Sequence, residues 1–351
     1  MGKRIVIMAG GTGGHVFPAL AVALWFIDNG WEVSWLGTHK GLESKVVPEN
    51  GIAIDWLSVA GVRGKGLLSK LGAGLKLVKA CGQAFAILRC RKPDVVLGMG
   101  GFVAGPGGLM AKVLGIPLVV HEQNRIPGTT NRLLAKIANQ VLEAFPDSFK
   151  KATNAKCTGN PLRREFVAST FEKNFAVGNN LRLLILGGSQ GAQVLNEVIP
   201  DSLANLKAIE VKHQTGVVMQ EQVAKRYQEL SIKAEATAFI KDMVSAYQWA
   251  DMIICRAGAM TVSEVSAMGL PAILIPLPNA IDDHQMANAR YLSDAGAGLI
   301  LRQKELTAVK LLELITKVQR QLEVMSKAAK QCARVDATES VAKFCMVEAR
   351  K

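Results

Sequence analysis

The chain has 351 residues, of which 49% are hydrophobic and 20% are charged. This composition excludes a disordered chain, and the length predicts about two domains. The formal net charge of +13 favours an acidic partner, such as a phosphate-bearing substrate, an anionic membrane or nucleic acid. Aromatic residues make up only 5% and are not interleaved with the Lys and Arg residues. That argues against single-stranded nucleic acid, whose binding depends on aromatic stacking.

The cysteines and the N-terminal residues indicate the compartment. The six cysteines form no Cys-x-x-Cys pair and several lie in apolar surroundings, so we expect reduced core side chains in a cytoplasmic protein. The apolar run at Ile5–Ala9 is too short for a signal peptide, and no run is long enough for a transmembrane helix. Any membrane contact is therefore expected from one side only.

The first residues predict the opening of a doubly wound α/β domain. Residues 4–9 have the composition of a buried strand, and the glycine turn Gly10–Gly14 follows it. A helix is expected next, with Pro18 in its first turn and its end at Asn29–Gly30. The second strand is expected from Trp31 to Leu36.

The glycine turn departs from two nucleotide-binding motifs. Val16 occupies the third glycine position of the dinucleotide fingerprint, and the second strand ends near Thr38 without an acid for a ribose. The turn also lacks the Gly-Lys-Ser/Thr of a P-loop. It is either a tight turn alone or a place where a phosphate or sugar approaches closely. Glycines on both sides of Thr12 at a helix start favour the second interpretation.

The stretch Arg63–Lys92 carries eight basic residues and no acidic one. Leu67, Leu71, Leu75 and Val78 recur in it at helical spacing. It is either the solvated face of an ordinary helix or a basic amphipathic element on an anionic bilayer. Because Phe85 is its only aromatic residue, membrane binding would depend mainly on charge and therefore on salt.

Two further strands of the first half end in polar or glycine-rich segments. The strand Asp94–Met99 leads into a second glycine-rich loop, Gly100–Gly108, before a helix. The strand Pro117–His121 is followed by Glu122, Gln123 and Asn124. These polar residues either form a turn or face a ligand, since ligands of open α/β sheets bind at the carboxyl ends of strands.

The second half repeats the pattern of the first. After a turn-rich crossing at Thr158–Arg164, the strand Leu181–Leu186 leads through the glycine loop Gly187–Gly191 into a helix. This repetition predicts two similar α/β domains.

The stretch Ile253–Asn288 has the features most typical of a ligand-binding site. Its strand ends near Cys255, and a helix with a Thr261–Glu264 capping-box spacing follows. A buried strand, Ala272–Leu277, then leads to Asp282, Asp283, His284 and Gln285. An exposed helix N-terminus beside these polar groups predicts a nucleotide-phosphate site.

Seven segments together identify a family. They are AGGTGGHVFPALAVA, DVVLGMGGFVAGPGG, HEQN, TGNPLR, LGGSQGA, FIKDM and CRAGAMTVSE, in this order over residues 4 to about 290. With them the chain resembles the MurG family of N-acetylglucosaminyltransferases of bacterial peptidoglycan synthesis. The resemblance implies the GT-B fold, an α/β fold of two Rossmann-like doubly wound domains with a cleft between them. Residues 1–161 would bind acceptor and membrane, with a C-terminal helix of about 330–351 packing back on them, and residues 162–329 would bind UDP-GlcNAc.

The resemblance also implies the reaction. GlcNAc is transferred with inversion from UDP-GlcNAc to the 4-hydroxyl of MurNAc in lipid I (undecaprenyl-pyrophosphoryl-MurNAc-pentapeptide), which gives lipid II and UDP. The implied location is the cytoplasmic face of the cell membrane, as a peripheral protein attached through Arg63–Lys92. Cell-wall and division machinery are the implied protein partners, and no nucleic acid is expected.

Residue roles follow by matching the family's motifs. Ile240 would bind uracil through backbone groups, unless it is an ordinary core residue. Glu264 would accept the ribose hydroxyls, unless it only caps its helix. Arg163 would neutralise the diphosphate, with a linker surface charge as the alternative, and Gln285 and Asn124 would bind the GlcNAc hydroxyls. The complete donor-binding set is Thr12, Gly13, Gly14, Asn124, Arg163, Ser189, Gln190, Ile240, Ala259, Met260, Thr261, Val262, Ser263, Glu264 and Gln285.

His15 is our choice for the general base that takes the proton of the acceptor hydroxyl, with Glu122 as the rival. A helix N-terminus disfavours the imidazolium form, which would keep His15 neutral; a loop-holding or phosphate-binding role is the alternative. The acceptor pyrophosphate would lie against Gly10, Gly11, Gly100 and Gly101. We expect no metal or other cofactor, because the chain lacks an Asp-x-Asp motif and the adjacent Asp282 and Asp283 would point apart.

Other functions share parts of this pattern. Another UDP-sugar enzyme of the GT-B type, a lipid glycosyltransferase or an epimerase, would keep much of the second-half site. A nicotinamide-dependent oxidoreductase is disfavoured by the missing third glycine and the missing strand-end acid. A non-enzymatic basic binding module would not need two glycine-loop domains.

Overall fold

The computed structural model describes residues 2–59, 67–168, 173, 175, 180–187, 192–278 and 283–349, with the backbone alone for residues 67–73, 75 and 192. Contacts divide the chain into two compact units. Unit 1 comprises Met1–Arg163 and Val335–Lys351, and unit 2 comprises Arg164–Arg334.

Unit 1 is built on a seven-stranded sheet in the order β3-β2-β1-β4-β5-β6-β7. Every neighbouring pair is parallel. The strands are β1 (Arg4–Ala9), β2 (Glu32–Gly37), β3 (Ala53–Trp56), β4 (Val95–Gly100), β5 (Leu118–Glu122), β6 (Gln140–Glu143) and β7 (Lys156–Cys157). A parallel sheet buries both faces, and β1 shows how, because alternate side chains enter opposite layers. Ile5 and Ile7 belong to one hydrophobic cluster, and Val6 and Met8 belong to the other.

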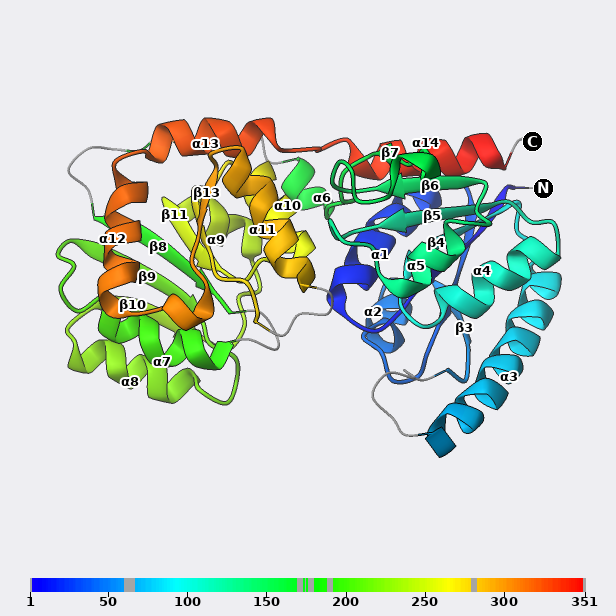
Figure 1. The fold of residues 1–351 in the computed structure, drawn as a ribbon, viewed down its shortest axis with the longest axis horizontal. Helices are drawn as coiled ribbons and strands as arrows, with labels where there is room; N and C mark the ends of the chain where they lie inside the picture. Colours follow the sequence, from blue (N-terminus) through cyan, green and yellow to red (C-terminus); the bar gives the residue numbers. More distant parts are fainter. Residues whose placement is uncertain are drawn as a thin grey trace. The chain divides into compact units, whose positions relative to one another are not determined.

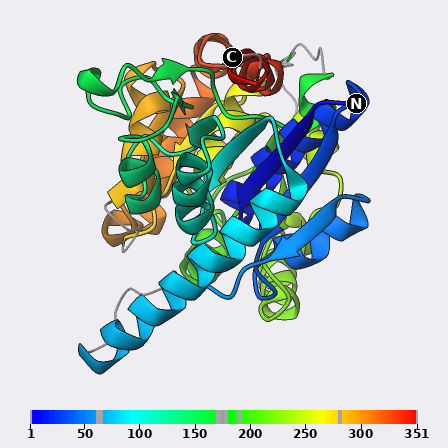
Figure 2. The ribbon, with the colours of Figure 1, turned by 90° about the vertical axis from the view of Figure 1, so that its right-hand side faces the viewer.

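Helices cover both faces of this sheet (Figure 1). They are α1 (Gly13–Asp28), α2 (Glu43–Glu49), α3 (Leu67–Arg91), α4 (Ala104–Val113), α5 (Thr129–Leu134), α14 (Ala337–Glu348) and the short 3-10 helix η1 (Lys151–Thr153). Residues of α1, α2 and α14 fill the first cluster, and residues of α3, α4 and α5 fill the second. The long helix α3 projects beyond the sheet at its N-terminal end (Figure 2).

The last helix of the chain belongs to unit 1. On α14, Val341, Ala342 and Cys345 are fully buried in the cluster that contains Phe26 of α1. The two ends of the chain meet, because Lys3 Nζ donates a 2.8 Å hydrogen bond to the carbonyl of Ala349. Figure 1 shows them next to each other.

Unit 2 repeats the architecture with a six-stranded parallel sheet in the order β10-β9-β8-β11-β12-β13. The strands are β8 (Leu181–Leu186), β9 (Ile209–Gln214), β10 (Lys233–Thr237), β11 (Met252–Cys255), β12 (Ala272–Leu274) and β13 (Gly298–Ile300). The helices are α6 (Arg164–Val167), α7 (Ala192–Ser202), α8 (Gln220–Glu229), α9 (Met243–Trp249), α10 (Ala259–Ala267), α11 (His284–Asp294), η3 (Gln303–Glu305), α12 (Ala308–Gln319) and α13 (Leu322–Gln331). In both sheets the first strand of the unit is third from one edge and the chain then reverses direction, which is the doubly wound order of a Rossmann-like domain. The expected fold class is therefore confirmed.

Some local expectations were wrong. The helix after the first glycine turn begins at Gly13, so Pro18 lies in its second turn, not its first. The second glycine-rich loop is short, because Gly105, Gly107 and Gly108 lie within α4. The strand expected to reach Leu277 ends at Leu274. All six cysteines are free, and whereas Cys255 and Cys345 are buried, Cys90 and Cys157 are exposed.

Candidate active site

In unit 1 the two glycine loops meet at the point where the strand order reverses. Strands β1 and β4 are neighbours, with Ala9 paired to Gly100, so their carboxyl ends lie together. A Cβ on Gly101 would lie 2.3 Å from the carbonyl oxygen of Gly10, so only glycine permits this approach. Gly11, Gly100 and Gly101 also have positive φ values of 98°, 102° and 79°. Ligands of such sheets bind at this place.

His15 stands at this junction, on the third residue of α1. A Cβ on Gly100 would lie 2.9 Å from His15 Nδ1, so the glycine makes room for the imidazole. Thr12 is the N-cap residue but its side chain makes no capping hydrogen bond, and Gly13 and Gly14 are the first two helical residues. The start of α1 therefore presents backbone amides next to His15.

The end of β5 reaches the same place through residues that the sequence analysis did not assign. Gln123 Oε1 lies 2.6 Å from His15 Nδ1, and Gln123 Nε2 lies 3.0 Å from His121 Nδ1. His121 Nε2 lies 2.9 Å from the carbonyl of Gly159. His121 is fully buried, and burial lowers its pKa to about 4. The sequence contained a signal for this contact, because alternate residues along a strand point to the same face of the sheet, and His121 and Gln123 are two residues apart.

Glu122, the rival to His15, is 1% exposed and its carboxylate is fully engaged. Oε1 accepts hydrogen bonds from the backbone amide of Asn124 at 2.9 Å and from its side chain at 3.2 Å. Oε2 accepts from the Gly128 amide at 3.0 Å and the Asn131 side chain at 2.9 Å. This carboxylate holds the loop after β5, and Asn124 is part of that arrangement.

In unit 2 the helix α10 begins immediately after the loop that follows β11. Gly258 is its N-cap, no side chain caps it, and Val262 N donates to Gly258 O at 2.9 Å. The capping-box interpretation is therefore wrong, because Thr261 is the third helical residue and not the cap. No acceptor for the amides of Ala259, Met260 and Thr261 occurs within the described part of the chain, which leaves a positive helix end available to an anion.

The other residues of this segment divide by their contacts. Glu264 is half-buried, and its Oε2 accepts a 3.1 Å hydrogen bond from the hydroxyl of Tyr247. Val262 is fully buried, and Ser263 Oγ donates to the carbonyl of Ala259 at 3.0 Å.

Ile240 lines a recess of about 230 Å³ in the loop between β10 and α9. Thr237, Phe239 and Lys212 line it too. The hydroxyl of Thr237 is buried without a hydrogen-bond partner among the described residues. Asp242, at the same recess, caps α9 by accepting a 2.9 Å hydrogen bond from Ser245 N.

The remaining expected residues lie at loop ends. Gln285 is the second residue of α11, and its Oε1 accepts a 3.0 Å hydrogen bond from Leu277 N. Arg163 is half-buried at the end of the first segment of unit 1. Ser189, Gln190 and Asp282 lie outside the described residues, as do residues 63–66 of the basic stretch.

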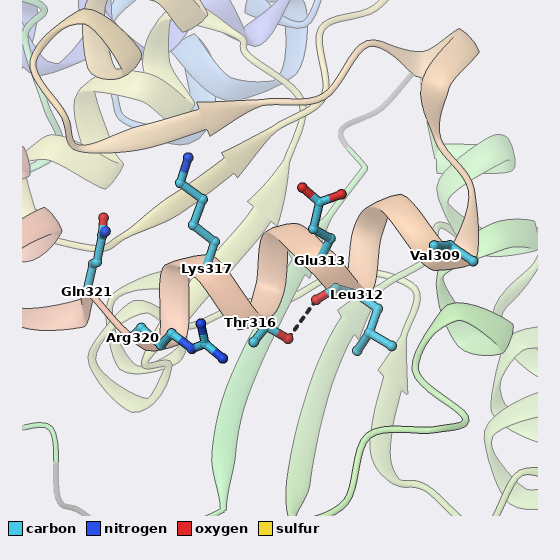
Figure 3. A pocket seen from close by; sticks show the side chains of 7 residues that line it. All are labelled: Val309, Leu312, Glu313, Thr316, Lys317, Arg320 and Gln321. Atoms are coloured by element: carbon cyan, nitrogen blue, oxygen red, sulfur yellow. Dashed lines mark hydrogen bonds between the residues drawn. The ribbon is translucent and has the colours of Figure 1, made fainter.

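A separate recess of about 560 Å³ lies along the outer side of α12 (Figure 3). It is lined by Val309, Leu312, Glu313, Thr316, Lys317, Arg320 and Gln321. None of the expected site residues lines it. Within the described ranges there is no cluster of three or more metal-ligating side chains. None of the helices described has the length and apolar character needed to span a bilayer.

Comparison with known proteins identifies the family of both halves. Residues 5–143 match the glycosyltransferase family 28 N-terminal domain, and residues 182–343 match the family 28 C-terminal domain. A UDP-N-acetylglucosamine–N-acetylmuramyl-(pentapeptide) pyrophosphoryl-undecaprenol N-acetylglucosamine transferase of Methylococcus capsulatus is 57% identical, over 99% of each chain. The protein of that name from Tolumonas auensis is 49% identical, over 98% of this chain and 99% of its own.

Solved structures agree. The crystal structure of Acinetobacter baumannii MurG superposes with a TM-score of 0.85 at 38% identity, over 98% of this chain and 99% of that one. Two Rossmann-like domains with these matches constitute the GT-B fold, and the resemblance drawn from the seven segments is confirmed. The chain belongs to the MurG family of UDP-N-acetylglucosamine-dependent glycosyltransferases.

Proposed function

We propose that this chain transfers GlcNAc from UDP-GlcNAc, with inversion, to the 4-hydroxyl of MurNAc in lipid I, which gives lipid II and UDP. The observation that carries the proposal is the position of His15 at the junction of the two glycine loops, in a chain that belongs to the family along its whole length. A histidine suits this task, because the attacking hydroxyl must lose a proton as it bonds to the anomeric carbon.

His15 is a better general base than Glu122. The Glu122 carboxylate accepts four hydrogen bonds, so both of its oxygens are already engaged in holding the loop after β5. His15 hydrogen-bonds through Nδ1, and no described residue hydrogen-bonds Nε2. Nε2 is therefore the atom that would accept the proton from the sugar hydroxyl. The acceptor pyrophosphate would lie against Gly10, Gly11, Gly100 and Gly101.

Unit 2 would hold the donor. The three unengaged amides at the start of α10 would stabilise the diphosphate, so that the charge of the leaving UDP is stabilised without a metal. Glu264, held by Tyr247, would accept the ribose hydroxyls. The recess at Ile240 is a suitable place for uracil. Gln285 would bind the GlcNAc hydroxyls.

The exposed part of α3 would place the enzyme at the cytoplasmic face of the membrane as a peripheral protein, beside the cell-wall and division machinery. Leu77 and Val78 are 52% and 71% exposed there, and Lys76 and Lys79 are exposed beside them. On α4, which packs against α3, Val113 is 62% exposed. Apolar side chains among lysines suit an anionic bilayer surface.

A transfer assay tests the function. The purified protein is mixed with labelled UDP-GlcNAc and lipid I, and the lipid product and UDP are quantified with and without EDTA. We expect lipid II in both cases, and a His15→Gln variant slower by about 100-fold or more, the typical contribution of a general base. A thermal-shift panel should give stabilisation by UDP-GlcNAc and UDP but not by NADH. Stabilisation by NADH alone, or no transfer to lipid I, would contradict the proposal.

A further inference from the structure

A hydrogen-bonded chain connects a backbone carbonyl to His15 within unit 1. It runs from Gly159 O to His121 Nε2 at 2.9 Å, from His121 Nδ1 to Gln123 Nε2 at 3.0 Å, and from Gln123 Oε1 to His15 Nδ1 at 2.6 Å. His121 is 0% exposed and Gln123 is 1% exposed. Water therefore does not compete for these contacts, and the chain sets the hydrogen positions along its length.

The carbonyl of Gly159 decides the first position, because a carbonyl oxygen only accepts hydrogen bonds. His121 Nε2 must therefore carry the hydrogen. Burial lowers the pKa of His121 to about 4, so its imidazole is neutral near pH 7 and Nδ1 has a lone pair. Only the amide nitrogen of Gln123 can donate to that lone pair. The same nitrogen also donates to the backbone carbonyl of His121 at 3.1 Å, which fixes the side chain in one orientation.

The second position follows. With its nitrogen turned to His121, Gln123 presents its oxygen to His15 Nδ1, and that oxygen also only accepts. Nδ1 of His15 must then carry the hydrogen. A neutral imidazole has a single N–H, so Nε2 of His15 is left with a lone pair. This is the opposite of the tautomer that free histidine prefers in water.

We propose that His121 and Gln123 are positioning residues that hold His15 in its Nδ1–H tautomer. The catalytic consequence, that Nε2 is ready to take a proton from the acceptor hydroxyl, rests on the function proposed above. The tautomer itself does not, and it can be measured without substrate.

The experiment is nitrogen NMR on the full-length protein labelled with ¹⁵N-histidine, at neutral pH. The chain has only five histidines, and the His15→Gln variant identifies the His15 signals by their loss. Protonated and bare ring nitrogens resonate far apart, so the spectrum reads the tautomer directly. We expect a protonated Nδ1 and a bare Nε2 for His15.

Three variants test the chain. Gln123→Met removes the acceptor at similar size and should shift His15 toward a mixture of tautomers. His121→Phe removes the side-chain acceptor that orients Gln123 but keeps the backbone carbonyl of residue 121, so we expect a smaller shift in the same direction. Gln123→Glu keeps an oxygen acceptor facing His15 and should retain the Nδ1–H form. The matched control is Gln140→Met, a half-buried glutamine of β6 that donates to Val141 O, and it should leave the His15 signals unchanged.

Kinetics give the second measurement. Gln123→Met should lower kcat by at least about tenfold with little change in KM for UDP-GlcNAc, since a wrong tautomer of a histidine base costs up to about 10⁴-fold in kcat. A bare Nδ1 in the unaltered protein, or an unchanged tautomer in Gln123→Met, overturns the proposal, and an unchanged tautomer in His121→Phe overturns the role assigned to His121. A His15→Gln variant with unchanged kcat would instead overturn the role of His15 as base, while the spectra still decide the tautomer.

Discussion

The carboxylate of Glu43 hydrogen-bonds the backbone amide of Gly11 at 2.9 Å and thereby ties the start of α2 to the first glycine loop. Its other oxygen accepts from Thr38 N at 2.9 Å and from Thr38 Oγ1 at 2.8 Å. Glu43 is 0% exposed. A Cβ added to Gly10 would lie 2.7 Å from a carboxylate oxygen of Glu43, and a Cβ added to Gly41 would lie closer still. Glycines thus surround a buried carboxylate that is stabilised by three hydrogen bonds and holds the loop beside His15.

Replacing Glu43 should therefore destabilise unit 1. Glu43→Ala leaves buried donors without an acceptor and should cost about 2–4 kcal/mol. Glu43→Gln should also destabilise, because either orientation of the amide turns an NH₂ group toward an N–H donor. Urea unfolding followed by tryptophan fluorescence measures this, since Trp25, Trp31, Trp35 and Trp56 of the five tryptophans lie in unit 1. Exposed Glu49→Ala on the same helix is the control, and an equal effect there would contradict the prediction.

The sequence was sufficient for the architecture and for the positions of the two glycine loops in unit 1. The order strand, glycine loop, helix recurs along the chain, and this order is typical of a doubly wound domain. Each of the two glycine loops of unit 1 follows the end of its strand. Helix starts were less predictable. Gly258 has the extended ψ of 144° of an N-cap, so α10 begins before Thr261 could act as one, and the capping box did not form. The geometry of the strand-to-helix turn, and not the spacing of Thr261 and Glu264, decides where α10 begins.

Contacts between distant segments could not be predicted. Nothing near Glu43 in the sequence points to Gly11, which is 32 residues away and bonded only because β1 and β2 are neighbours. The same holds for Gln123 and His15, which are 108 residues apart. Sequence patterns predicted where the glycine loops lie along the chain, whereas the hydrogen bonds that orient side chains beside them depend on strand order.

The contact between Tyr247 and Glu264 gives a test of the donor site. Glu264→Gln should raise KM for UDP-GlcNAc by about 10-fold or more, because a hydrogen bond to a charged group contributes about 1.5–3 kcal/mol. Tyr247→Phe removes only the group that holds Glu264 and should raise KM a few-fold, with kcat nearly unchanged. Steady-state kinetics at saturating lipid I measure both. The control is exposed Glu221→Gln on α8, and a Glu264→Gln enzyme with the KM of that control would refute the ribose role.

The lysines of α3 give a test of membrane attachment. Lys76→Glu with Lys79→Glu should lower binding to vesicles rich in anionic phospholipid by at least about tenfold, since each lysine near such a surface contributes about 1 kcal/mol. Added salt should lower binding of the unaltered protein in the same way. Lys207→Glu with Lys225→Glu changes the charge equally at exposed positions of unit 2 and serves as control. Equal vesicle binding by the two double variants would exclude α3 as the membrane surface, whereas UDP binding should be unchanged in both.

Burial of His213 should make unit 2 sensitive to acid. His213 is 0% exposed, Nδ1 lies 3.0 Å from the hydroxyl of Tyr227, and burial lowers the pKa of His213 from 6.5 to about 3. The unfolded chain therefore binds a proton at higher pH than the folded one. The stabilisation is fully present above about pH 6.5 and is lost as the pH falls toward about 3.

His213→Gln should remove this dependence, because glutamine keeps a polar partner for Tyr227 and does not titrate. Between pH 7 and pH 4.5 the unaltered protein should lose roughly 2.5 kcal/mol more stability than the variant, at about 1.4 kcal/mol per pH unit below the unfolded pKa. Scanning calorimetry at both pH values measures the difference. His39→Gln, at an exposed position, should behave as the unaltered protein does. Equal losses for His213→Gln and the unaltered protein would mean that His213 is not held neutral in the folded state.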